Sequence, residues 1–214
     1  FYGAERMVRI NQLPEGLKDL EAIADAWPEL ILIPKVEKAE DVLEVEKEIS
    51  RLSDKNSGRV KGSAHGVLFM PILESALGIE NAFEIARASR NVVAMAIGLE
   101  DYTADLGVKR TEAGGESLYA RTRLVNACKA AGIQPIDSVY SDVENMEGLL
   151  QNVETSRSLG FEGMGCIHPR QVAVIHQGFT PGTAEVEKAE KIVAAYEEAK
   201  RESYRFYSFG DAML

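Results

Sequence analysis

Short apolar, β-branched runs alternate in this sequence with longer segments whose apolar residues follow a helical period, and this alternation strongly constrains the fold. Two neighbouring parallel strands need a long crossover between them, usually a helix, so the pattern is typical of a parallel sheet covered by helices. The predicted strands are residues 7–11, 30–36, 66–74, 92–101, 133–140 and 163–169. The predicted helices are roughly residues 15–27, 39–53, 80–89, 117–131, 146–159, 170–177 and 183–203.

The predicted strands are almost continuously hydrophobic, which indicates that both of their faces are buried. Six strand–helix units are visible, whereas a closed (β/α)8 barrel has eight units in about 250 residues. Six parallel strands could also form an open doubly wound sheet, but no GxGxxG or GxxxxGK(S/T) phosphate-binding sequence follows any of them. We therefore expect the α/β class and a (β/α)8 TIM barrel, with its first two strands missing from this chain. Residues 1–214 would form a single barrel domain, comprising strands 3 to 8 of the barrel and a C-terminal helix.

The composition argues against several classes of partner. The formal net charge is −10, and a grip on nucleic-acid phosphates needs clustered Lys and Arg, so we expect no nucleic-acid partner. No apolar run approaches the ~20 residues needed to span a bilayer, so we expect no membrane partner either. Cys128 and Cys166 lie far apart and form no CxxC pair, which fits a cytoplasmic location and suggests neither a disulfide framework nor a zinc site.

Polar and ionisable residues follow nearly every predicted strand. In α/β barrels the active site lies at the carboxyl ends of the strands, so residues at these positions carry more functional weight than polar residues elsewhere. Ending buried strands in ionisable groups is costly unless the groups share a polar pocket. The residues in question are Arg9, Asn11, Lys35, Glu37, Glu74, Glu100, Asp101, Asp137 and His168.

Glu74 and Asp101 follow two sequential strands, and they are the candidate metal ligands. Mg²⁺ is commonly held by one or two carboxylates, with waters and substrate oxygens completing its octahedron. Each carboxylate has a simpler alternative role, which is to cap the following helix or to pair with Lys35. Two carboxylates at neighbouring strand ends favour the metal.

Arg9 is the candidate ligand for a substrate carboxylate, because its planar fork can donate two parallel hydrogen bonds. A structural salt bridge within the barrel is the alternative. Lys35 and Glu100 are further candidates for substrate binding. His168 precedes Pro169 and is either a general base or a structural hydrogen-bonding residue at a turn. We expect the other two histidines, His65 and His176, to be non-catalytic.

Several longer motifs carry a resemblance to a known family. In order, they are MVRIN, LILIPKVEKAEDV, PILESALGI, GLEDYTADLG, GIQPIDSVYSD and GFEGMGCIHPRQVAVIHQGFTP. Together they resemble the HpcH/HpaI aldolase and citrate lyase superfamily, most closely its citrate lyase beta-subunit branch. The resemblance implies a (β/α)8 barrel, a homotrimer or hexamer, Mg²⁺ held at Glu74 and Asp101, and Arg9 on the carboxylate of the oxoacid half. The implied substrate is a citryl, malyl or citramalyl thioester of coenzyme A or of an acyl-carrier protein.

Three functions remain open from the sequence. The first is a Mg²⁺-dependent lyase that cleaves a 3-hydroxyacyl thioester into an acetyl-type thioester and a 2-oxoacid. The second is a class II pyruvate-type aldolase, or a hydrolase or synthase of malyl thioesters, with the same metal pair. The third is a non-catalytic scaffold subunit of a lyase complex, which the presence of Arg9, Glu74 and Asp101 disfavours.

Overall fold

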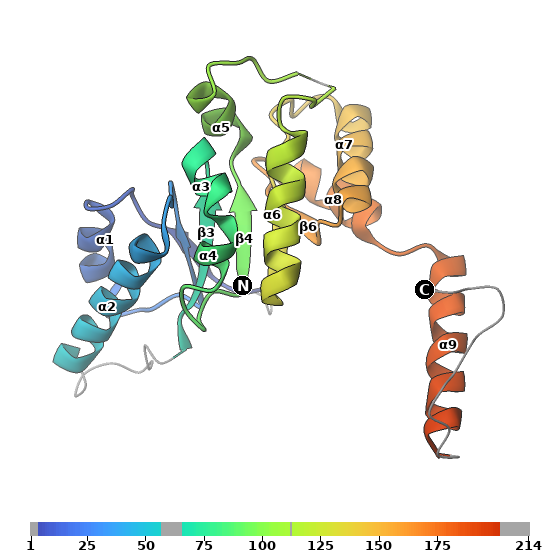
Figure 1. Ribbon diagram of the computed structural model, residues 1–214, viewed down its shortest axis with the longest axis horizontal. Helices are drawn as coiled ribbons and strands as arrows, with labels where there is room; N and C mark the ends of the chain where they lie inside the picture. The colour runs from blue at the N-terminus through green and yellow to red at the C-terminus, as the bar shows by residue number, and fades with distance from the viewer. Residues whose placement is uncertain (1–3, 57–65, 112, 202–214) are drawn as a thin grey trace.

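The six predicted strands form one sheet. The computed structural model describes residues 4–56, 66–111 and 113–201, and its strands pair in the order β1-β2-β3-β4-β5-β6, each parallel to the next (Figure 1). The sheet curls into a half-barrel, which confirms the α/β class. The strands are β1 (Met7–Arg9), β2 (Leu30–Ile33), β3 (Leu68–Leu73), β4 (Ala94–Ile97), β5 (Gln134–Asp137) and β6 (Gly163–Met164).

Helices connect the strands and cover one face of the sheet, whereas most of the last helix, α9, extends away from the other elements (Figure 1). None of the helices in the described part of the chain is long and apolar enough to cross a membrane. The helices are α1 (Gly16–Ile23), α2 (Ala39–Asn56), α3 (Ala76–Glu80), α4 (Ala82–Ala86), α5 (Leu99–Asp105), α6 (Leu118–Ala131), α7 (Met146–Leu159), α8 (Pro169–Phe179) and α9 (Thr183–Arg201).

Both faces of the sheet are apolar, as the continuous hydrophobic runs predicted. In β2, Ile31 and Ile33 belong to the main core between sheet and helices, while Leu30 belongs to a smaller cluster with Met70 and Ala94. Because side chains alternate along a strand, this second cluster lies on the other, inner face of the curled sheet. The rim of that inner face is where a barrel active site would form.

The predicted strand at 92–101 is shorter in the structure. It ends at Ile97, and Gly98 leads directly into α5, so Glu100 and Asp101 lie in the first turn of a helix. Leu99 extends the apolar sequence beyond the strand, but it is buried as part of this helix together with Tyr102, and an apolar run alone does not separate strand from buried helix. The helix predicted at 80–89 corresponds to α4, which ends earlier at Ala86, and a second short helix, α3, precedes it and meets it at Asn81.

Candidate active site

Four predicted site residues lie at one rim of the half-barrel. Arg9 ends β1, Lys35 follows β2, Glu74 follows β3, and Asp101 lies four residues after the end of β4. Since all the strands are parallel, their carboxyl ends meet at the same edge.

Arg9 and Glu74 also share the inner face of the sheet. Arg9 is in register with Leu32, and Leu32 with Met70, which belongs to the inner cluster. Glu74 lies four residues beyond Met70, so strand alternation places it on the same side. The electrostatic environment agrees, because the charge of Arg9 acts on the Glu74 carboxyl.

Glu74 is partly buried and packs closely against Gly98. A Cβ atom at position 98 would lie 2.6 Å from Cγ of Glu74 and 2.7 Å from its Oε1, so only glycine leaves this side chain its present place. Burial raises the pKa of Glu74 above its ordinary value, and the negative charge of Asp101 raises it further. The charges of Lys35 and Arg9 and the Lys35 backbone amide act in the opposite direction without cancelling the rise. Burial is the largest cause of the rise, and the effect of Asp101 shows that the two carboxylates lie close enough for their charges to interact.

Asp101 has a loose ionic partner in Lys35. The distance from Nζ of Lys35 to Oδ1 of Asp101 is 3.7 Å, and the two side chains are 46% and 55% exposed. An exposed pair at this distance contributes little to stability. Lys35 itself has a left-handed backbone with φ of 52°, which is uncommon for a residue with a side chain and is often found at functional sites. The ion pair with Lys35, which was the predicted alternative role of Asp101, is therefore present. It is weak enough for a divalent cation to replace Lys35 as the partner of Asp101.

The donor set fits a hard divalent cation. Within residues 4–56, 66–111 and 113–201, no group of three or more His, Cys, Asp and Glu side chains could hold a metal. A cation between Glu74 and Asp101 would therefore have two protein ligands and would take its other ligands from water or substrate, which is the usual coordination of Mg²⁺. The feature that fits such an ion is the proximity of two carboxylates from neighbouring strand ends, of which Glu74 is partly buried.

Glu100 lies beside Asp101 in α5 and is engaged differently. Its Oε1 accepts hydrogen bonds from Nη1 of Arg110 at 2.6 Å and from Oγ of Ser141 at 2.9 Å. These bonds, that of Arg110 first, hold the pKa of Glu100 below its ordinary value. The contacts connect α5 to neighbouring loops, and a role of Glu100 in substrate binding stays a prediction.

Asp137, at the end of β5, faces the helices. It is buried, forms an ion pair with Arg121 of α6, and accepts a hydrogen bond from Oγ of Ser156 of α7 at 2.6 Å. Arg121 also lies over the ring of Phe161, 5.7 Å from its centroid. Asp137 therefore joins the sheet to two helices and does not take part in the candidate site.

His168 has the structural role that was one of its two predicted alternatives. It is the N-cap of α8, where its Nδ1 accepts a hydrogen bond from the Arg170 backbone N–H at 3.2 Å, and Pro169 occupies the first helical position. Oε1 of Gln171 accepts from the His168 backbone N–H in return. Of the other two histidines, His176 lies exposed on α8 and His65 lies outside the described residues.

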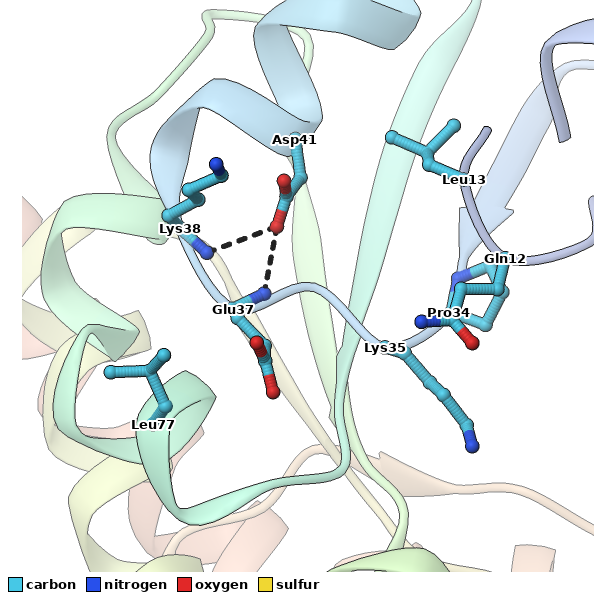
Figure 2. A pocket seen from close by; sticks show the side chains of 8 residues that line it. All are labelled: Gln12, Leu13, Pro34, Lys35, Glu37, Lys38, Asp41 and Leu77. Carbon is cyan, nitrogen blue, oxygen red and sulfur yellow. Dashed lines mark hydrogen bonds between the residues drawn. The ribbon is translucent and has the colours of Figure 1, made fainter. Parts of the chain in front are cut away.

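A cavity adjoins the candidate site at Lys35. Its volume is about 340 Å³, and Figure 2 shows that its walls come from the loops after β1 and β2, the start of α2, and α3. Asp41 accepts hydrogen bonds from the backbone N–H groups of Glu37 at 2.9 Å and Lys38 at 3.1 Å, so it shapes the wall of the cavity. Two polar residues of the cavity wall, Gln12 and Lys38, were not predicted as site residues, although both follow strands that carry predicted site residues. The lining residues are Gln12, Leu13, Pro34, Lys35, Glu37, Lys38, Asp41 and Leu77.

The chain is similar to a characterised family along most of its length. The model of the family described as HpcH/HpaI aldolase/citrate lyase matches residues 1–169. A second model, described as a queuosine biosynthesis protein, matches only residues 183–214 and carries no functional argument. The chain is 41% identical to citrate lyase subunit beta of Escherichia coli (strain K12) over 212 residues, which are 98% of this chain and 69% of that protein.

Solved structures agree with this similarity. The citrate lyase beta subunit of M. tuberculosis, complexed with oxaloacetate and magnesium, is 29% identical with a TM-score of 0.67, and the match covers 82% of this chain and 73% of that one. A structure of the M. tuberculosis protein with magnesium, acetoacetate and coenzyme A has a TM-score of 0.71 at 27% identity, covering 97% of this chain and 72% of that one. The ligands in both structures include a magnesium ion and a small oxoacid.

Proposed function

Because the chain belongs to the HpcH/HpaI aldolase/citrate lyase family, we propose that it is a Mg²⁺-dependent carbon–carbon lyase. Its substrate is a 3-hydroxyacyl thioester, and its products are an acetyl-type thioester and a 2-oxoacid. One observation carries the proposal: the charge of Asp101 raises the pKa of Glu74, so two carboxylates from separate strand ends lie close together, beside Arg9 and Lys35, at the rim where barrel enzymes bind substrate.

In this proposal Glu74 and Asp101 hold the Mg²⁺ ion. The ion supplies electrostatic stabilisation of the negative charge that develops on the substrate hydroxyl oxygen. Arg9 binds the carboxylate of the oxoacid half through two parallel hydrogen bonds, which fixes the scissile bond relative to the two acidic side chains. Lys35 adds positive potential next to Asp101.

The reaction is the reverse of an aldol addition. The substrate hydroxyl loses its proton, its oxygen becomes the ketone of the 2-oxoacid, and the carbon–carbon bond breaks. The bonding electrons move to the carbon next to the thioester carbonyl, which becomes an enolate and then takes up a proton. Three of the rim residues would act on the oxoacid half: Arg9 would bind its carboxylate, and Glu74 and Asp101 would hold the ion that stabilises the developing charge.

We further propose that the six-stranded half-barrel corresponds to strands 3 to 8 of a (β/α)8 barrel, as one domain with the C-terminal helix. Its support is the sequential parallel order of the strands and the position of the site residues at their carboxyl ends. The proposal also includes a homotrimeric or hexameric assembly and a cytoplasmic location. The thioester carrier is coenzyme A or an acyl-carrier protein. The coenzyme A in the M. tuberculosis structure supports the thioester substrate.

The test is a screen of citryl, malyl and citramalyl thioesters with Mg²⁺, using the wild type and Asp101→Asn. We expect the wild type to release a 2-oxoacid from one of them, and Asp101→Asn to lose that activity while its circular dichroism spectrum is unchanged. Asp105→Asn is a matched control on the same helix, since an amide oxygen can still accept the hydrogen bond that Asp105 takes from the Ala76 N–H at 2.8 Å.

Each alternative gives a different result in this screen. Cleavage of free hydroxyacids as fast as thioesters would indicate the aldolase, and thioester hydrolysis without a 2-oxoacid would indicate the hydrolase. A folded wild type that binds no Mg²⁺ and cleaves nothing would be the scaffold subunit. Undiminished cleavage by Asp101→Asn would refute the metal site.

A further inference from the structure

Residues outside helix α5 form hydrogen bonds with its first turn, the turn that carries Asp101. Its N-cap is Gly98, which has no side chain to cap the helix. Instead, the backbone N–H of Leu99 donates a buried hydrogen bond to Oγ of Ser138 at 3.2 Å. The neighbouring Glu100 accepts from Oγ of Ser141 at 2.9 Å. The loop after β5 therefore supplies the contacts that a capping side chain would otherwise provide.

The side chain of Arg110 contacts both helix α5 and the loop after β5. Its Nη1 donates to Oε1 of Glu100 at 2.6 Å, and its Nη2 donates to the carbonyl oxygen of Val139 at 3.1 Å. The Arg110 side chain is 21% exposed, so it lies mostly covered between α5 and the loop after β5. A planar guanidinium can direct two nitrogens at two acceptors in this way, whereas an ammonium group is a single point charge.

The loop that receives these contacts is itself tied to the core. Nε2 of Gln171, a fully buried side chain, donates to the Tyr140 carbonyl oxygen at 2.9 Å. The backbone N–H of Ser138 donates to Oδ1 of Asp137 at 2.8 Å, and Asp137 belongs to the buried ion pair with Arg121. Arg110 therefore bonds to a loop that is held from two further directions.

Asp101 needs such support because its own contacts are weak. Its carboxylate is more than half exposed, and its ion pair with Lys35 spans 3.7 Å. A metal ligand has to be held close to its productive geometry, and groups that orient ligands affect metal affinity strongly. Glu100 is the adjacent residue of the same helical turn, so fixing its side chain fixes the turn that presents Asp101.

We infer that Arg110 is a positioning residue, which through Glu100 and the Val139 carbonyl holds the first turn of α5 so that Asp101 presents its carboxylate to Mg²⁺. The inference rests on the proposed function, because it assumes that Asp101 is a metal ligand. It also gives Glu100 a structural task in the site, in place of a contact with substrate.

The experiment measures metal affinity without turnover. Mg²⁺ binding is followed by calorimetry, and Mn²⁺ binding by electron paramagnetic resonance, for the wild type, Arg110→Gln, Arg110→Lys, Glu100→Gln and the double variant Arg110→Gln/Glu100→Gln. We expect each Gln variant to bind the metal about tenfold more weakly, at the lower end of the effect of removing a group that orients a ligand. The double variant should bind the metal no more weakly than Arg110→Gln, which already loses the contacts with both Glu100 and Val139. Arg110→Lys should recover part of the affinity.

Stability separates this role from a merely structural one. Because the pair with Glu100 is largely exposed on the Glu100 side, its loss should move the melting temperature by no more than about 2 °C. Arg157→Gln is the matched control: it breaks the exposed pair between Arg157 and Glu185, 2.7 Å apart and joining α7 to α9. It should leave metal affinity unchanged.

The outcomes distinguish the inference from the proposed function. Wild-type metal affinity in Arg110→Gln and Glu100→Gln, with binding lost in Asp101→Asn, would overturn the inference and leave the proposed function standing. Absence of metal binding in the wild type would overturn both. Additive losses in the double variant would show that Arg110 does not act through Glu100. If Arg110→Gln fails to fold, the isosteric Glu100→Gln decides, since the same loss of affinity is expected from it.

Discussion

The substitution Gly98→Ala should displace Glu74, one of the two proposed metal ligands, and leave the rest of the protein unchanged. The backbone at Gly98 has φ of −108° and ψ of 95°, which alanine adopts without strain. Its added Cβ would lie 2.6 Å from Cγ of Glu74, whereas ordinary contacts begin at 3.4 Å. Glu74 must therefore move by about 0.8 Å. A misplacement near 1 Å can cost about 100-fold in rate, or about 2.7 kcal/mol of transition-state stabilisation.

We expect kcat/KM to fall about 100-fold in this variant and Mg²⁺ affinity to fall at least tenfold. The free energy of unfolding should change little, because the atoms that must move belong to the flexible Glu74 side chain. Alanine also lowers the conformational entropy of the unfolded chain, which favours the folded state by about 0.4–1 kcal/mol. The assays are steady-state cleavage, calorimetric Mg²⁺ titration and thermal unfolding. Gly66→Ala is the control: it precedes the strand that leads to Glu74, and its Cβ would meet nothing within 4 Å. Wild-type affinity in Gly98→Ala would refute the assignment of Glu74.

Three further predictions test other parts of the site and fold. Arg9→Lys should raise the Kd for the 2-oxoacid about tenfold, measured by calorimetry with Mg²⁺ present, because a point charge cannot reproduce two parallel hydrogen bonds; an unchanged Kd would exclude the predicted grip. Because the pKa of Glu74 is raised, the folded state binds the Glu74 proton more tightly than the unfolded state does. Without Mg²⁺, the free energy of unfolding should therefore fall as the pH rises from 4.5, the ordinary pKa, through the raised pKa. Denaturant titrations should show this loss in the wild type and not in Glu74→Gln, and equal pH profiles would contradict it. Arg121→Met should destabilise the fold by about 3–5 kcal/mol in urea, because it leaves the buried Asp137 carboxylate unpaired; a loss below about 1 kcal/mol would argue against that pair.

Much of the fold was predictable because both faces of the sheet are buried. Runs such as the one around Ile31 read as strands for that reason, and their parallel order followed from the helices between them. The ends of the strands were less predictable. Leu99 continues the apolar run of β4, yet it is buried as part of a helix, so the sequence alone did not separate β4 from α5.

The site was predictable at residue level only in part. The parallel order of the strands brings Arg9, Lys35, Glu74 and Asp101 to one rim, and this followed from their positions after strands. Side-chain direction was not predictable in the same way. Asp137 also ends a strand, but it faces the helices because Arg121 and Ser156 meet it there, and these partners lie 16 and 19 residues away in sequence.

Glu100 shows the same limit within a single helical turn. It is adjacent to Asp101 and also bears a carboxylate, yet its partner is Arg110, ten residues on, in a segment where no regular element was predicted. The pattern of strand ends identifies which residues can reach the rim. Which of these residues face the candidate metal site depends on contacts between loops. Such contacts leave no periodic pattern in the sequence.

Anomalous diffraction from crystals of the protein soaked in Mn²⁺ tests whether Glu74 and Asp101 share one divalent ion. We expect a single strong anomalous peak between the two carboxylates, with metal–oxygen distances close to the roughly 2.0–2.1 Å of Mg²⁺ sites. A peak bound to only one of them, or no peak at this rim at a concentration that supports cleavage, would contradict it.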